Sequence, residues 1–69
     1  HLRRHWEVMQ RQPQLLDAFR QVLQDPEHGA QIDTLMAYQL ERMGLVRLAG
    51  NSTVVSSELY YKYYKTRLL

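Results

Sequence analysis

Residues 40–55 read LERMGLVRLAGNSTVV, and this stretch decides the fold. Gly44 stands where a helix commonly ends, because glycine adopts the left-handed conformation of a helix terminus. Residues 45–48 (LVRL) and 53–55 (TVV) are rich in strand-forming residues, and residues 49–52 (AGNS) between them contain a hairpin turn signal. The pattern predicts a helix that ends on glycine and passes at once into a β-hairpin.

The helix that leads into the hairpin is predicted over residues 33–43, with Asp33 as its N-cap. Ile32, just before it, is predicted as a very short strand. A helical wheel divides the residues into two faces. The face predicted to be buried holds Ile32, Leu35, Met36, Gln39, Leu40 and Met43, and the exposed face holds Thr34, Ala37, Tyr38 and Glu41. Gln39 must then bond a backbone group or reach the core edge, or another domain covers that edge.

Two further helices are predicted before this one. Residues 2–10 place Leu2, Trp6 and Met9 on one face. Pro13 suits the first turn of a second helix, which should end by Gln24 because Asp25 precedes a proline. The apolar face of that second helix holds Leu15, Leu16, Phe19, Val22 and Leu23.

A last helix is predicted after Ser57, which can act as its cap. Its run of tyrosines should form two rows. The first row is Tyr60, Tyr64 and Leu68, and the second is Leu59 and Tyr63. With Leu59 on the core side of this helix, Tyr61 would then face outward, with Lys62 and Lys65 beside it. We expect Trp6, Phe19, Leu40 and Tyr63 to share one core.

The predicted order is helix, helix, short strand, helix, β-hairpin, helix. This is a mainly α fold with a small β-hairpin, arranged as a winged helix-turn-helix, and residues 1–69 form one domain. Because the chain starts at His1 and not at Met, we expect it to be part of a longer multidomain protein.

Composition narrows the classes of function. Nine Lys and Arg against seven Asp and Glu give a formal charge of +2, a mild basic bias. There is no Cys, so disulfides and thiolate metal sites are excluded. No apolar run approaches the ~20 residues of a membrane span, so we expect no membrane partner and a cytoplasmic location. A chain this short has no room for a deep active site.

Two groups of residues have side chains that could bind a metal or carry out catalysis. His1 and His5 have the i, i+4 spacing of a helical metal site, but two ligands are too few and His28 is distant. Nothing in the sequence places a base beside Ser52, Ser56 or Ser57. We therefore expect no catalytic, cofactor-binding or metal-binding residue, and no enzyme activity.

A winged helix often reads DNA with its third helix. The candidate contacts here are Thr34, Tyr38, Arg42 and Arg47. Asp33 and Glu41 lie on the same helix and oppose phosphate, so any binding to nucleic acid is expected to be weak.

The candidate interaction surface is basic and aromatic, and it comprises Arg3, Arg4, Tyr61, Lys62 and Lys65. It can be read as a solvated surface, as a docking site for an acidic neighbouring domain or a second copy, or as a weak phosphate-backbone contact.

Three blocks of the sequence resemble the C-terminal end of bacterial AAA-like ATPase domains in large signalling proteins, similar to the STAND class of P-loop NTPases. The blocks are HLRRHW at 1–6, YQLERMGLV at 38–46 and ELYYKYY at 58–64. The resemblance implies a winged-helix module that packs on a nucleotide-binding core and relays its state to other domains of the same protein.

The segment departs from a complete ATPase. It contains no G-x-x-x-x-G-K-[ST] loop and no Walker B strand, so ATP or ADP would be bound by an upstream domain. It also lacks the Met-His-Asp triplet that some related winged helices place near the nucleotide, so no residue of the ATPase site carries over. The alternatives are a DNA-binding winged-helix regulator and a stand-alone interaction or dimerisation module.

Overall fold

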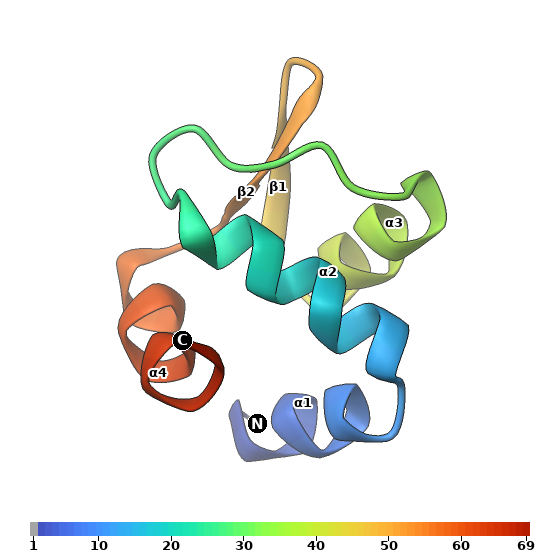
Figure 1. Ribbon diagram of the computed structural model, residues 1–69, viewed down its shortest axis with the longest axis vertical. Coiled ribbons are helices and arrows are strands. Elements are labelled where there is room, and N and C mark those ends of the chain that lie inside the picture. Colours follow the sequence, from blue (N-terminus) through green and yellow to red (C-terminus); the bar gives the residue numbers. More distant parts are fainter. Residues whose placement is uncertain (1) are drawn as a thin grey trace.

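The computed structural model describes residues 2–69 and contains four helices and one antiparallel hairpin in that range (Figure 1). The elements are α1 (Leu2–Gln10), α2 (Pro13–Gln24), α3 (Thr34–Arg42), β1 (Val46–Ala49), β2 (Ser52–Val55) and α4 (Glu58–Leu68). α1 and α4 lie at one end of the long axis, and the hairpin turn lies at the other. The predicted mainly helical class with a small hairpin is confirmed.

Local sequence signals fix where the helices begin and end. Pro13 occupies the first turn of α2, and the chain leaves this helix at Asp25, before Pro26. The Asp33 carboxylate caps α3 by accepting from the backbone N–H groups of Leu35 and Met36. Ser57 caps α4 by accepting from the N–H of Tyr60 at 3.2 Å. These boundaries agree with the prediction to within a residue.

The buried side of α3 differs from the predicted one. Leu35, expected in the core, is 58% exposed, whereas Ala37, expected at the surface, is buried. The reason is that α3 packs against both α2 and β1. A helix between two neighbouring elements buries residues on two sides. Ala37 is the buried residue of α3 on the side of the hairpin.

The hairpin pairs Val46 with Val55 and Ala49 with Ser52, so Gly50 and Asn51 form its turn. A third segment extends the sheet at Ala30, which forms a bridge with Thr53. The short strand was predicted at Ile32, and this was wrong. Gly29 has a φ of +76° and directs the chain so that Ala30 meets β2 two residues earlier than expected.

The core centres on Tyr64, which is fully buried against Phe19 of α2. Their ring centroids are 5.3 Å apart at an interplanar angle of 78°, an edge-to-face contact. Trp6 and Tyr63 pack against the same cluster but are only partly buried. Phe19 and Leu40 share the core as predicted, but Tyr64 takes the central place expected for Tyr63.

Leu59 was assigned to the core side of α4, and this was also wrong, because it is 64% exposed. The hydroxyl of Tyr64 donates to the backbone carbonyl of Leu2 at 2.8 Å and fixes α4 against α1. This places the row of Tyr60, Tyr64 and Leu68 inward and turns Leu59 to solvent. None of the helices in residues 2–69 has the length and apolarity needed to cross a membrane.

Candidate functional site

The structure gathers the basic residues at the α1–α4 end. Arg3 and Arg4 are exposed on α1, and Lys62 and Lys65 are exposed on α4. The Tyr64–Leu2 hydrogen bond holds the two helices together. Four of the five residues predicted as an interaction surface therefore lie exposed on adjacent helices at one end of the molecule.

Tyr61, the fifth residue of that predicted surface, does not project freely. It is half-buried and packs against the core, and the Lys65 ammonium lies 5.1 Å from the centre of its ring. The prediction that it faces fully outward was wrong. Lys62 pairs with Glu58 at 3.6 Å, a surface contact that leaves both side chains largely hydrated.

A second surface lies between α3 and the hairpin. Tyr38 on α3 is 54% exposed and Leu48 on β1 is 57% exposed, and a hollow of about 240 Å³ separates these elements. The hollow is lined by Ile32, Thr34, Ala37, Tyr38, Glu41, Leu48, Asn51 and Thr53. We call this set the α3–hairpin face.

Of the four candidate nucleic-acid contacts, Thr34 and Tyr38 line this hollow and are exposed. Arg42 is exposed, and its guanidinium lies 5.7 Å from the Tyr38 ring centre. Arg47 instead lines a separate hollow of about 450 Å³ with Glu27, Glu58 and Tyr61. Sequence reasoning missed Leu35 and Leu48 as surface residues, because apolar residues in a helix or strand are expected to be buried.

The α3–hairpin face offers little to phosphate. Glu41 lines its hollow, and the carboxylate of Asp33 stands at the N-terminus of α3. A phosphate backbone needs cations or free N–H groups at such a surface, but Asp33 already occupies the first N–H groups of the helix. The exposed side chains that line the hollow are Tyr38 and Leu48, the polar Thr34 and Asn51, and the acidic Glu41, and Arg42 lies beside Tyr38.

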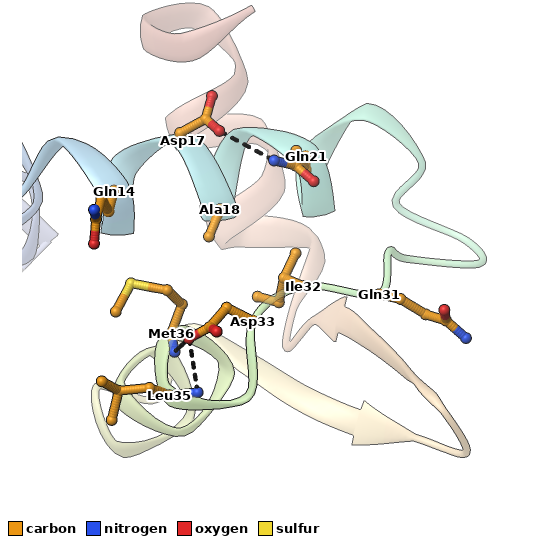
Figure 2. Close-up of a pocket in the computed structure, with 9 residues that line it drawn as sticks. All are labelled: Gln14, Asp17, Ala18, Gln21, Gln31, Ile32, Asp33, Leu35 and Met36. Carbon is orange, nitrogen blue, oxygen red and sulfur yellow. Dashed lines mark hydrogen bonds between the residues drawn. The ribbon is translucent and has the colours of Figure 1, made fainter.

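A third hollow, of about 460 Å³, lies between α2 and the start of α3 (Figure 2). Ala18, Ile32 and Met36 form its apolar part, and the Met36 side chain extends toward α2. Its two carboxylates are engaged inside the protein: Asp33 caps α3, and Asp17 accepts from the side-chain amide of Gln21 at 3.0 Å. The hollow therefore lies where α2 and α3 pack together, and both of its carboxylates already accept hydrogen bonds within the domain.

Gln39 lies on the same helix, and its side-chain oxygen Oε1 is buried with no hydrogen-bond partner among the described residues. Of the alternatives predicted for this amide, a bond to a backbone group is not made by that oxygen. A buried acceptor without a partner costs about 1–3 kcal/mol.

The surroundings of His5, Asp25 and Tyr64 shift the pKa of each side chain. Burial lowers the pKa of His5, and a hydrogen bond from the backbone N–H of His28 lowers the pKa of Asp25. Burial raises the pKa of Tyr64 to about 12. Residues 2–69 contain no group of three His, Cys, Asp or Glu side chains that could hold a metal, and His1 of the considered histidine pair lies outside the described residues.

Charge is unevenly distributed over the molecule. Residues 25–58 contain five of the seven Asp and Glu but only two of the nine Lys and Arg. This segment comprises the loop before α3, α3 itself, the hairpin and Glu58, the first residue of α4. Without Glu58 it holds four acidic and two basic residues. The α1–α4 end is therefore basic, and the end that carries the α3–hairpin face is acidic.

The model of the AAA-like domain family matches residues 1–66. The chain therefore belongs to the AAA-like domain family, as its resemblance to AAA-like ATPases implied. Comparisons with curated proteins and with solved structures found no match.

Proposed function

We propose that this domain is a winged-helix module of an AAA-like signalling ATPase that lacks catalytic activity of its own. The element order and the bridge between Ala30 and Thr53 support the winged-helix assignment, because they give three helices followed by a small sheet of the expected connectivity. In this proposal ATP or ADP is bound by an upstream domain, and the module packs on that nucleotide-binding core.

The observation that carries the proposal is the character of the α3–hairpin face. Tyr38 and Leu48 expose more than half of their surface on the two elements that a DNA-binding winged helix would turn to the duplex. Aromatic and aliphatic side chains with a nearby carboxylate favour a protein surface over a phosphate backbone. The domain is thereby suited to contacts with other domains.

The two ends of the molecule have different roles in this proposal. The basic α1–α4 end docks on an acidic surface of the nucleotide-binding core, and the α3–hairpin face contacts a neighbouring domain. A relay needs contacts whose free energy differs between two states. The core would supply that difference by moving its acidic surface when ATP replaces ADP.

The test uses the full-length protein and the substitution Tyr38→Ser. We expect nucleotide binding to be unchanged, but the difference in domain arrangement between the ADP and ATP states to be lost or strongly reduced. Small-angle X-ray scattering in each nucleotide state measures this. Gln24→Ser, on the exposed side of α2, is the matched control and should behave as wild type. An unchanged response in Tyr38→Ser would contradict the proposal.

Binding to duplex DNA separates this function from the alternative of a DNA-binding regulator. We expect weak, sequence-independent binding that disappears as salt rises, and no change in sequence preference for Arg42→Ala. Fluorescence titration at several salt concentrations measures it. A tight, site-specific complex near physiological salt would favour the regulator.

A further inference from the structure

The small sheet has one closed edge and one open edge. At the closed edge, the N–H of Thr53 donates to the carbonyl of Ala30 at 2.8 Å, and the N–H of Ala30 donates to the carbonyl of Thr53 at 2.9 Å. Both backbone groups of Thr53 are thus used. Leu48 is the residue opposite Thr53 in the hairpin register, so its own N–H and C=O must point away from β2.

No strand pairs with β1 on that outer side within residues 2–69, because β1 is a terminal strand of the two-stranded sheet. Proteins usually cover or blunt such an edge with charge or proline. On β1 the charged residue is the exposed Arg47, which lines the other hollow with Glu27 and Glu58. The outward backbone groups belong to Leu48, whose exposed side chain lines the hollow with Tyr38 and Thr53. The open backbone groups therefore adjoin an apolar hollow.

The charge of the residues around this edge indicates which kind of partner it would attract. Glu41 lines the hollow and takes part in no ion pair within residues 2–69. The surrounding segment, residues 25–58, is acidic overall. A second copy pairing through β1 would bring two acidic segments together, whereas a basic segment would be attracted.

We propose that β1 accepts an extended basic segment of a neighbouring domain as an additional strand. The backbone of the segment bonds the outward N–H and C=O of Leu48. Because side chains alternate along a strand, an apolar residue of the segment covers Leu48 and Tyr38, and a Lys or Arg faces Glu41. This inference rests on the proposed function, since it specifies how the partner engages the α3–hairpin face.

Hydrogen exchange of the full-length protein in its nucleotide-free, ADP and ATP states tests the strand addition, with fragmentation that resolves single amides. For each amide the protection factor is the intrinsic exchange rate divided by the measured rate. The outward amide of Leu48 should have a protection factor at least about tenfold above that of Asn51, an exposed turn residue, in at least one state. A tenfold change corresponds to about 1.4 kcal/mol, close to the net value of one hydrogen bond.

Two substitutions at Leu48 separate the backbone contribution from the side chain. Leu48→Pro removes the outward N–H without removing a bond to β2, since proline is tolerated on an edge strand. Leu48→Val keeps the amide and an apolar side chain. We expect Leu48→Pro to lose the protection of the neighbouring outward amide, that of Val46, and Leu48→Val to retain it.

A protection factor at Leu48 no higher than that at Asn51 in all three states would overturn the inference. Protection that grows with protein concentration would also overturn it, because a second copy would then be the occupant. If Leu48 is unprotected while Tyr38→Ser still abolishes the nucleotide response, strand addition fails and the proposed function stands. If neither effect is seen, both fail.

Discussion

The two halves of this domain are stabilised in different ways. Around α1, α2 and α4, aromatic rings meet in the interior, with Tyr64 between Trp6, Phe19 and Tyr63. Around α3 and the hairpin, large apolar side chains remain at the surface, and the backbone bonds between Ala30 and Thr53 hold the small sheet. Both halves contribute to the core, which is aromatic around Tyr64 and aliphatic around Leu40 and Val46. The comparison therefore separates a half built on aromatic packing from a half in which a small sheet and aliphatic residues carry Tyr38 and Leu48 at the surface.

The largest expected effect lies in the aromatic half. Phe19→Ala removes a fully buried ring that contacts Tyr64 at 5.3 Å and leaves a cavity. We expect a loss of about 3–5 kcal/mol in the free energy of unfolding. Urea denaturation of the domain measures it. A loss below about 1 kcal/mol would mean that the aromatic cluster is not the main source of stability.

The next effect tests the hairpin half. Gly29→Ala places a methyl group against the backbone carbonyl of Thr53 and 2.6 Å from Cγ1 of Val54, at a positive φ. We expect a loss of about 2–3 kcal/mol, because backbone atoms cannot move aside cheaply. Gly44→Ala is the control: its φ is +81° but nothing lies within 4 Å, so about 1 kcal/mol is expected. Equal losses would show that the backbone at Gly29 is not tightly packed.

A smaller effect distinguishes packing from hydrogen bonding in the aromatic half. Tyr64→Phe keeps the ring but removes the hydrogen bond to Leu2, and we expect a loss of about 1 kcal/mol. The measurement is thermal or urea unfolding at neutral pH.

The Tyr64→Phe variant should also differ from the wild type in how its stability depends on pH. The pKa of Tyr64 is raised from 10.0 to about 12, so between these values the folded protein retains a proton that the unfolded chain has lost. Stability should therefore fall as pH rises through this window, and fall less steeply in Tyr64→Phe. Identical slopes for both proteins would contradict the burial of this hydroxyl.

The smallest effect on stability is expected in the α3–hairpin face. Tyr38→Ser removes a side chain that is more than half exposed, so the free energy of unfolding should change by no more than about 0.5 kcal/mol. Urea denaturation beside Phe19→Ala sharpens the comparison. A loss above about 2 kcal/mol would mean that Tyr38 belongs to the core.

Helix ends were predicted correctly from the sequence, because each depends on the conformation or hydrogen bonding of the backbone next to one residue. Asp33, Ser57, Pro13 and Gly44 each set a helix end through local geometry, and each was assigned from the sequence. The order of helices and strands followed from these signals together with apolar spacing.

Sequence reasoning failed where tertiary neighbours decide. Leu35 and Leu59 have the spacing of core residues, yet both are exposed because the neighbouring elements lie against other sides of their helices. The third segment of the sheet was placed at Ile32 and lies at Ala30, since a positive φ at Gly29 does not show in a hydrophobic pattern.

Of the two candidate surfaces, one could be predicted from the sequence and the other could not. The basic residues of α1 and α4 could be found from the sequence, because charged side chains are almost always exposed. The α3–hairpin face could not be assembled in this way. Leu48 is an apolar strand residue, and only the register of the hairpin shows that its backbone faces outward.

The contacts that join the two ends of the chain have a mechanical consequence. Tyr64 binds the carbonyl of Leu2, and the Arg20 guanidinium donates to the carbonyl of Leu68 at 3.3 Å. Tyr64 is also the centre of the aromatic cluster, so α4 cannot leave α1 without exposing that cluster. A force that pulls Leu2 and Leu68 apart would therefore be resisted by the aromatic core as well as by these hydrogen bonds.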